Sequence, residues 1–512
     1  MKKVLFPIIL LVTFILPFKV NAATGITDAS TLKTQLQNGG DFRLDADITL
    51  TTNSSVNNTT TLDLNGHTLN MSDKTLIING TTTVKDTSSN GKITSSAMFT
   101  VQVGSSSNST ATLKVLSGTI QGASEYGAIR NYGNTEIDGG TVKANSFTIY
   151  NQNNLRLKSG TIIVRDYVAV QVYTNSTFTM DGGLITFETN TSDNGSLVNL
   201  YGDCSATINN GTIDASATKG AGITVYKNTN LTINGGTITG DDCAIMGNGA
   251  LSGNSQGTNA NITINGGNLT SHTGPGIYLP QADSEHLITG GTITGVSGVE
   301  IRSGKLTITG GSLNSNRDTY EIINNDNGST TYGAGLAIAQ HVTKQPIEVI
   351  INGGSFNAPA PYSEVNPANN PIEDLQKINV TINQGEFNKS GEESVETAYV
   401  RPFIKGGTYD NDVSELVDDD YGVVQINNQY EVNKKYIEIC TISALINGKE
   451  YILKVKANEA IEIMKMIRKI FEDECERIYV TEYDPFSKET NMSLENILSI
   501  IKNNDNAENK VK

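Results

Sequence analysis

Two adjacent carboxylates, Asp241 and Asp242, are the residues of this chain whose types and spacing are best suited to chemistry. They stand in the segment Gly240-Asp241-Asp242-Cys243-Ala244-Ile245, and carboxyl groups are among the side chains that transfer protons in catalysis. The histidines are scattered along the sequence, and no Gly-Gly-x-Gly-x-Asp calcium repeat occurs; the four are His67, His272, His286 and His341. The sequence therefore predicts no metal site and no cofactor, and it makes Asp241 and Asp242 the catalytic candidates if the protein is an enzyme.

The aspartate segment resembles the paired-aspartate motif of polygalacturonase-type glycoside hydrolases. The resemblance implies a parallel β-helix in which carboxylates act as acid and base and invert the configuration of the sugar. Further along, the chain departs from the family pattern. Gly274-Pro275-Gly276 replaces a Gly-His-Gly motif, and Glu300-Ile301-Arg302 replaces Arg-Ile-Lys. Proline cannot transfer a proton, and Glu300 reverses the charge that would hold an acidic sugar.

Two further parts of such sites are missing from the sequence. No Asn-Thr-Asp triplet precedes the aspartates near Gly220-Ala221-Gly222, so a third carboxylate is absent. Pectate-lyase chemistry would need an acidic cluster that holds calcium beside an arginine base, whereas Arg165-Asp166 and Arg302 stand without such a cluster.

A repeated sequence motif defines the strands and bends that must position these residues. It occurs twelve times between Gly118 and Gly407, most plainly as Ile233-Asn234-Gly235-Gly236-Thr237-Ile238, at intervals of 20 to 43 residues. In every copy an apolar residue stands three positions before the last glycine and another stands two positions after it. Two short strands joined by a glycine bend, followed by a third strand such as Gly222–Tyr226, predict an all-β solenoid, the right-handed parallel β-helix.

Asparagine often precedes the glycine pair, as at Asn234 and Asn265. Stacked amides at a bend can hydrogen-bond from coil to coil and satisfy polar groups that the bend turns inward. The turn propensity of Asn and Gly is the alternative explanation.

The chain divides into three predicted parts. Residues 1–22 have the features of a signal peptide, namely Lys2 and Lys3, an apolar run and Val20-Asn21-Ala22 before the cleavage point. Residues 23–432 form the β-helix with an N-terminal cap, in which Asp28–Leu36 is a short helix. Residues 433–512 form a small α+β domain of unknown role.

Both ends of the rod carry the resemblance to a family. Leu62–Leu69 and Leu76–Ile93 resemble the opening coils of pectate-lyase-like β-helix proteins on bacterial surfaces. Gly406–Tyr409 and the segment that follows resemble the last coil of such modules in Gram-positive bacteria. The resemblance implies an adhesin-like surface protein, although the same fold carries lyases, hydrolases and adhesins alike.

In the tail, a hairpin is expected to turn at Asn447-Gly448, followed by a helix near 460–471, a strand at 477–483 and a last helix at 493–501. Cys440 and Cys475 lie in this part, and the sequence leaves open whether they form a disulfide. Cys204 and Cys243 occupy different coil positions, so free buried thiols are expected there.

Charge limits the partners. Residues 23–432 contain 21 basic and 39 acidic residues, so long-range attraction to nucleic acid, polyanions or anionic lipid is excluded. No transmembrane segment is expected after signal cleavage, and the expected location is secreted, extracellular or at the cell surface. A polysaccharide or a cell-surface glycan is the expected partner, and the oligomeric state is left open.

The longest repeat intervals fall between Gly236 and Gly385, and their added residues are Leu251–Asn261, Arg317–Thr331 and Ala358–Pro371. Functional groups of solenoids often lie on such insertions. Here they would present Tyr320, Tyr332 and Tyr362 to sugars, unless the insertions are merely tolerated.

Two functions of different class follow from the sequence. The first is a non-catalytic secreted or surface-displayed β-helix protein, adhesin-like, that binds glycans or cell-surface components. The alternative is a polysaccharide lyase or glycoside hydrolase of the pectin-degrading β-helix type, with Asp241 and Asp242 at its site.

Overall fold

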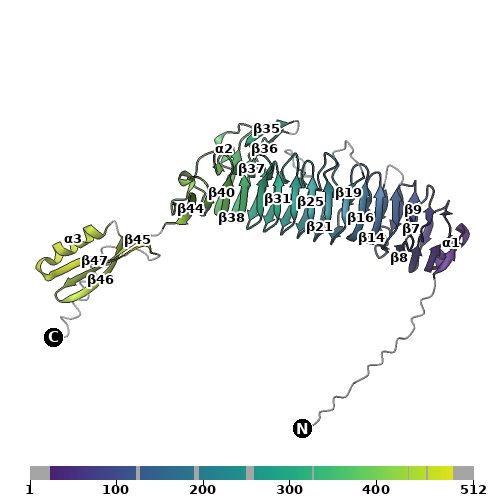
Figure 1. Ribbon diagram of the computed structural model, residues 1–512, viewed down its shortest axis with the longest axis horizontal. Coiled ribbons are helices and arrows are strands. Elements are labelled where there is room, and N and C mark those ends of the chain that lie inside the picture. Colours follow the sequence, from purple (N-terminus) through teal and green to yellow (C-terminus); the bar gives the residue numbers. More distant parts are fainter. Residues whose placement is uncertain are drawn as a thin grey trace, which may run out of the picture.

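The computed structural model describes residues 23–122, 127–188, 195–248, 259–325, 328–435, 437–456 and 459–487. The chain winds into a parallel β-helix whose coils lie side by side along an elongated rod (Figure 1). The expected all-β solenoid is therefore confirmed. The expected signal peptide at residues 1–22 and the expected last helix at 493–501 lie outside the described residues.

Each regular coil contributes three strands. A first-row strand runs into the glycine bend, a second-row strand leaves it and a third-row strand closes the coil, as in β24 (Thr229–Ile233), β25 (Thr237–Gly240) and β26 (Ile245–Gly247). These strands pair in parallel with their equivalents in the coils before and after, and no residue shift interrupts the register. The third row contains 14 strands, so at about 4.8 Å per coil the rod is about 65 Å long.

The three rows have the following members. Besides β24, the first row contains β1 (Thr24–Ile26), β2 (Gly40–Leu44), β5 (Thr60–Asp63), β8 (Thr81–Lys85), β11 (Thr112–Val115), β18 (Thr177–Met180), β21 (Cys204–Ile208), β27 (Asn261–Ile264), β30 (Glu285–Ile288) and β33 (Gly304–Ile308). Besides β25, the second row contains β3 (Ile48–Thr49), β6 (Thr68–Asn70), β9 (Lys92–Ser95), β12 (Thr119–Gly122), β19 (Leu184–Phe187), β22 (Thr212–Ala215), β28 (Asn268–Ser271), β31 (Thr292–Gly295), β34 (Ser312–Ser315) and β42 (Gly407–Tyr409). Besides β26, the third row contains β4 (Ser54–Val56), β7 (Leu76–Ile78), β10 (Phe99–Val103), β13 (Gly127–Asn131), β15 (Ile149–Asn151), β17 (Val170–Val172), β20 (Val198–Leu200), β23 (Ile223–Val225), β29 (Ile277–Leu279), β32 (Ser297–Ile301), β37 (Ala334–Ala339), β39 (Ala360–Val365) and β41 (Val395–Glu396).

Four long strands run through the glycine bend and belong to the first and second rows at once. They are β14 (Asn134–Ala144), β16 (Asn154–Val164), β38 (Ile347–Ala358) and β40 (Ile378–Lys389). Because these strands continue through the bend, they join the two rows into a single sheet, which has 28 strands when the C-terminal hairpin strands β43 (Tyr421–Ile426) and β44 (Gln429–Lys434) are included.

The glycine bend depends on a backbone that other residues rarely adopt. The last glycine of all twelve copies has positive φ, for example 87° at Gly236. A Cβ added to Gly236 would lie 2.7 Å from the carbonyl oxygen of Gly211 in the coil below. Glycine is therefore required both by the left-handed backbone and by the close approach of successive coils.

The core is a narrow stack of apolar columns. All residues three positions before and two positions after the repeat glycines are buried, as the sequence predicts. Near the C-terminal end one column becomes aromatic, where Phe356, Phe387 and Tyr409 stack at 4.7 and 4.8 Å with rings 3° from parallel. Tight stacking follows from direct pairing of these positions, Phe356 with Phe387 and Phe387 with Tyr409, beyond a local register shift at the bend between β38 and β40.

The predicted asparagine ladder is present. Asn265 Nδ2 donates to Asn234 Oδ1 at 2.9 Å, and Asn234 Nδ2 donates to Asn209 Oδ1 at 2.8 Å. Asn209 in turn donates to Asp181 at 2.8 Å. The expected orientation was wrong, because these side chains are exposed at the outer edge of the bend. The ladder therefore satisfies side-chain amides at the surface rather than buried groups.

Both ends of the rod are capped. At the N-terminal end, the predicted helix is α1 (Ala29–Asn38), whose Asp28 cap accepts from the backbone N–H groups of Ser30 and Thr31 at 3.0 Å. At the C-terminal end, β43 (Tyr421–Ile426) and β44 (Gln429–Lys434) form an antiparallel hairpin, and β44 pairs antiparallel with β42. A reversed strand blocks further parallel addition of coils. Two short elements, α2 (Ile372–Leu375) and a 3₁₀ turn at Ser414–Leu416, precede this hairpin.

The described C-terminal residues form a unit with its own core. Its antiparallel sheet has the order β46 (Lys449–Lys456), β45 (Ile437–Ile446), β47 (Cys475–Ser487), and α3 (Ala460–Phe471) packs on one face. A 3₁₀ turn at Glu472–Glu474 leads from α3 into β47. Ile463 and Ile467 of α3 share a cluster with Ile442 and Leu453 that is separate from the core of the rod.

All four cysteines are free thiols. Cys204 and Cys243 are buried, as expected. In the tail, Cys475 pairs with Ile446 of β45, six residues along that strand from Cys440. This separation is about 20 Å along a strand, which a disulfide cannot bridge.

Acid should destabilise the rod through His286. This side chain is buried in β30 between Ile262 and Leu306 of the adjacent coils, and neither ring nitrogen has a hydrogen-bond partner among the described residues. Burial lowers the pKa of His286 to about 4 from an ordinary value of 6.5. The unfolded chain therefore binds the proton first, and about 3 kcal/mol of stability is lost as the pH falls from about 6.5 to about 4. We expect His286→Leu to raise the unfolding midpoint and to reduce its decrease between pH 7 and pH 4.5. An unchanged pH dependence in denaturant unfolding would contradict this explanation.

Candidate functional site

Asp241 and Asp242 lie in the bend between β25 and β26. The N–H groups of both residues donate to the carbonyl oxygen of Gly220 in the preceding coil, at 3.1 and 3.2 Å. The carbonyl oxygen of Asp241 accepts from the N–H groups of His272 and Thr273 in the next coil, at 3.1 and 2.7 Å. The backbone of the pair is therefore held by ordinary coil-to-coil contacts.

The two carboxyl groups differ in environment. Asp241 Oδ1 lies 3.7 Å from His272 Nδ1 at the surface. Asp242 is partly buried, and this burial, with the charge of Asp241 as a smaller cause, raises the pKa of Asp242. A carboxyl group with a raised pKa keeps its proton to a higher pH than an ordinary carboxyl group, which is a property of general acids.

Glu300, which occupies the position of the sugar-binding arginine in the polygalacturonase-type motif, is part of the protein interior. Glu300 is fully buried, and its Oε1 accepts from Arg302 Nη2 at 2.7 Å and Nε at 2.8 Å. Its Oε2 accepts from the backbone N–H of Thr331 at 3.0 Å. The guanidinium of Arg302 lies 4.8 Å from the ring centroid of Tyr278. Glu300 and Arg302 therefore bind each other and an insertion of this chain, and Glu300 is not presented to a substrate.

That insertion is the segment predicted as a functional loop at Arg317–Thr331. It contains an antiparallel hairpin, β35 (Glu321–Asn325) and β36 (Gly328–Tyr332), which lies over the third row near β37 (Figure 1). The hydroxyl of Tyr320 lies 2.7 Å from Ser363 Oγ of β39, and the hydroxyl of Tyr332 donates to the carbonyl oxygen of Thr273 at 3.5 Å. Both rings thus fasten the hairpin to the rod.

The third tyrosine expected to contact sugars does not do so. Tyr362 is fully buried because Ala358–Pro371 contains β39, whose alternation turns this ring into the core. Its hydroxyl bonds Glu364, whose carboxylate forms a bidentate pair with Arg401 at 2.7 and 2.8 Å. Of the remaining insertion, Leu251–Asn261, residues 251–258 lie outside the described residues.

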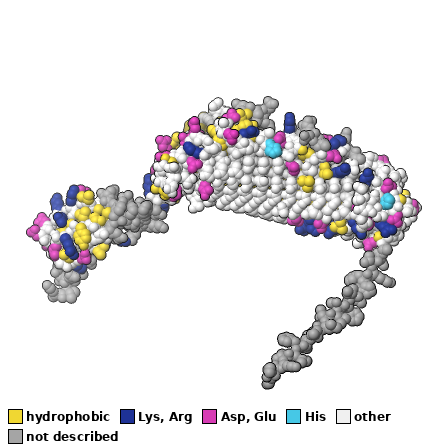
Figure 2. All heavy atoms as spheres, viewed as in Figure 1, with side chains coloured by type: hydrophobic (Ala, Val, Ile, Leu, Met, Phe, Trp, Pro, Cys, Tyr) yellow, Lys and Arg dark blue, Asp and Glu magenta, His cyan; other side chains and the backbone are white. Residues whose placement is uncertain are grey.

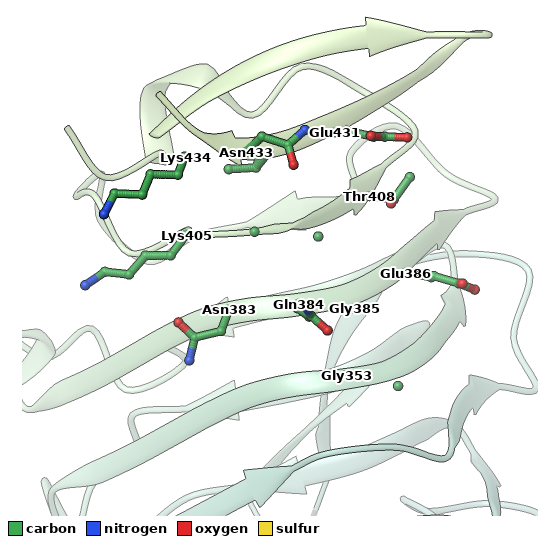
Figure 3. A pocket seen from close by; sticks show the side chains of 14 residues that line it. Gly353, Asn383, Gln384, Gly385, Glu386, Lys405, Thr408, Glu431, Asn433 and Lys434 are labelled. Carbon is green, nitrogen blue, oxygen red and sulfur yellow. The ribbon is translucent and has the colours of Figure 1, made fainter. Parts of the chain in front are cut away.

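Three polar hollows lie along the bends of the rod. One of about 570 Å³ is lined by Asn175, Asp203, Asn228 and Asn259, and another of about 480 Å³ contains Asp283, Glu285, Lys305 and Lys377. A third, of about 450 Å³, lies at the last coils (Figure 3).

In the third hollow, Lys405 and Lys434 point away from the side that holds Glu386 and Glu431 (Figure 3). Neither Asp241 nor Asp242 lines any of these three hollows. Within the described residues no group of three His, Cys, Asp or Glu side chains could hold a metal ion. None of the helices in the described ranges is long and apolar enough to cross a membrane.

A row of aromatic rings that sequence reasoning missed follows the outer side of the third row. Tyr150, Tyr173, Tyr201 and Tyr226 lie on four successive coils, with centroid separations of 4.4, 5.7 and 5.1 Å. Two further rings, Phe147 and Tyr167, extend the row sideways. The ring centroid of Phe147 lies 6.3 Å from that of Tyr150 and 5.0 Å from that of Tyr167. We call the following six residues the aromatic stripe: Phe147, Tyr150, Tyr167, Tyr173, Tyr201 and Tyr226.

Parts of the stripe are open to solvent. Tyr167 is 49% exposed and Tyr201 is 38% exposed. The ring of Tyr201 is inclined at 58° to both of its neighbours, whereas Tyr150 and Tyr173 cover each other at 29°. Hydrophobic side chains gather on the upper flank of the rod in Figure 2, above a broad face that is almost free of charge.

The stripe is close to neutral. Burial raises the pKa of the Tyr173 and Tyr226 phenols, so both remain protonated at neutral pH. Arg165 is paired with Asp166 at 2.8 Å. Arg130, at one end, lies 4.8 Å from the ring centroid of Tyr132. Such a surface combines apolar rings with hydroxyl groups and has no dominant charge.

A sequence signal for the stripe exists. Its four central tyrosines each stand ten residues before a repeat glycine, namely Gly160, Gly183, Gly211 and Gly236. For Tyr173, Tyr201 and Tyr226 this offset corresponds to equivalent positions, each directly after a third-row strand, so a row of rings is expected once a β-helix is assumed. Tyr150 shares the offset but is aligned with Gln171, because the bend that follows it is shorter. These four repeats are of ordinary length, so repeat length alone does not indicate the stripe.

Comparisons with family models, with curated proteins and with solved structures found no match. The class of the protein, a parallel β-helix solenoid with a small C-terminal α+β unit, therefore rests on the structure itself.

Removal of the Glu300 carboxylate should loosen the hairpin. Glu300→Gln leaves Arg302 without its buried counter-charge, which costs about 3 to 5 kcal/mol when one partner of a buried pair is removed. The matched control is Glu348→Gln, because the exposed pair of Glu348 with Lys305 at 3.0 Å contributes at most about 1 kcal/mol. We expect a lower unfolding midpoint and faster proteolysis within residues 321–332 for the Glu300 variant alone. Equal effects of both variants would refute a role for Glu300 in holding the hairpin.

Proposed function

We propose that this protein is a non-catalytic, secreted or surface-displayed β-helix protein, adhesin-like, that binds glycans through its repetitive outer surface. The proposal rests on one observation, the aromatic stripe on four successive coils. Tyrosine presents a rigid apolar ring beside a hydroxyl group, and sugars present apolar C–H faces beside hydroxyl groups. Kinship with pectate-lyase-like surface proteins of Gram-positive bacteria is part of the same proposal.

The charge of the rod supports this choice of partner. With 21 basic and 39 acidic residues in residues 23–432, the rod repels nucleic acid and polyanionic polymers. Uncharged glycans are not subject to this repulsion. Display outside the cell follows from the features of residues 1–22, namely Lys2 and Lys3 before an apolar run.

The alternative, a polysaccharide lyase or glycoside hydrolase, is favoured by the raised pKa of Asp242. Two carboxyl groups, one of which has a raised pKa, are the minimum for acid–base cleavage. Against it, Pro275 cannot transfer a proton, and Glu300 is buried with Arg302. We therefore rank cleavage below binding.

Binding should be detectable on a polysaccharide array with the protein from Ala23 onward. We expect retention on at least one glycan, and we expect Tyr167→Ala/Tyr201→Ala to weaken it about tenfold or more, because large aromatic residues dominate such interfaces. Tyr479→Ala is the matched control, since Tyr479 is 43% exposed in the C-terminal unit. No retention on any glycan would refute the proposed function.

Cleavage is tested in the same wells by measuring new reducing or unsaturated sugar ends. We expect none from the wild-type protein. Release that disappears in Asp241→Ala/Asp242→Ala, with unfolding unchanged, would instead establish the enzymatic alternative.

A further inference from the structure

We propose that the aromatic stripe binds a neutral, extended oligosaccharide that lies along the rod axis, one sugar unit per coil, with Tyr201 as the main stacking residue. This inference rests on the glycan-binding function proposed above and adds the class, direction and length of the ligand.

The direction follows from the register. The N–H groups of Tyr173, Tyr201 and Tyr226 donate to the carbonyl oxygens that end the third-row strand of the coil before, at 3.0, 2.8 and 3.0 Å. The three tyrosines therefore occupy equivalent positions separated by about 4.8 Å per coil. This rise is close to the length that one pyranose unit adds to an extended chain. Successive sugars along the axis would meet successive tyrosines.

Tyr201 has the most suitable ring of the central tyrosines. It is the most exposed of the four, at 38%, and it is inclined at 58° to Tyr173 and to Tyr226 rather than stacked flat on either. Tyr150 and Tyr173 are stacked on each other, so they contribute edges and hydroxyl groups instead. Tyr167, 49% exposed, adds a second open ring beside the row.

A row of polar side chains accompanies the rings. Gln171 and Asn199 stand two positions before Tyr173 and Tyr201, and alternation places them on the same outer side of the third row. Asn199 is more than nine-tenths buried, and its Oδ1 has no hydrogen-bond partner among the described residues. Its Nδ2 reaches Gln171 Oε1 only at 3.5 Å. The Oδ1 atom is itself buried, so a ligand hydroxyl would satisfy this acceptor only after a side-chain movement at the surface of the row.

The charges beside the stripe favour a neutral ligand. Asp203 stands two residues after Tyr201, and Lys227 stands directly after Tyr226. The charges next to these two rings therefore have opposite sign. The cations at the other end are engaged, Arg165 with Asp166 and Arg130 with the rings of Tyr132 and Tyr150. A uronic acid chain would need a row of available cations, which this arrangement does not provide.

The test uses the protein from Ala23 onward with neutral oligosaccharides of two to six units, cello-oligosaccharides and N-acetylglucosamine oligomers, and with oligogalacturonates of the same lengths. We expect the affinity for one neutral series to rise with each unit up to about four units and then to level off, because four coils carry the central tyrosines. Tyr201→Ala should raise Kd about tenfold, and Tyr201→Phe should restore most of the loss. Tyr479→Ala should have no effect.

The outcomes separate this inference from the proposed function. Retention on the polysaccharide array without binding of either neutral series, or without an effect of Tyr201→Ala, overturns the inference and leaves the proposed function standing. Stronger binding of oligogalacturonates than of neutral oligomers also overturns it. No retention on any glycan removes the proposed function and this inference together.

Discussion

The close approach of successive coils at the glycine bend is the constraint on which the rest of the structure depends. At Gly236 the backbone is left-handed, and a side chain would collide with the carbonyl oxygen of Gly211. Because the bend recurs, strands of successive coils stay in register. The inward-facing side chains of one coil therefore stack on the inward-facing side chains at the equivalent positions of the next coil. The apolar columns, the aromatic stack from Phe356 to Tyr409 and the ladder from Asp181 to Asn265 are consequences of that register.

The same register explains why the surface and the insertions have different roles. Regular coils repeat one position along the axis, so Tyr173, Tyr201 and Tyr226 form a row on the outside, and Tyr150 of the preceding coil stacks on the first of them. The 43-residue repeat that ends at Gly354 interrupts the regular pattern, and its hairpin must be attached by polar contacts. Those contacts bury Glu300 with Arg302 and join Tyr320 to Ser363. The insertion is thus a cover of the third row, while the regular coils provide the open surface.

The different roles of the insertion and the regular coils favour binding over catalysis. A polygalacturonase-type hydrolase would need its charged groups directed toward a substrate cleft. Here the carboxylate of Glu300 instead binds Arg302 and the backbone of the hairpin. Asp241 and Asp242 remain a pair of carboxyl groups whose backbone is held by coil-to-coil contacts. An extended neutral polymer needs no cleft, because a row of equivalent side chains on a rigid rod already matches its periodicity.

The sequence alone determined the solenoid, its apolar columns, the N-terminal capping helix and the strand-helix order of the described C-terminal unit, because these depend on local spacing of glycine, capping and apolar residues. It also contained the tyrosine column ten residues before four repeat glycines. Only the tertiary structure decided that Tyr362 is core, that Tyr320 and Tyr332 fasten a hairpin, and that Glu300 is buried with Arg302. The physical reason is that a side chain in an irregular insertion is placed by contacts with distant coils, whereas a side chain in the repeat is placed by the period itself.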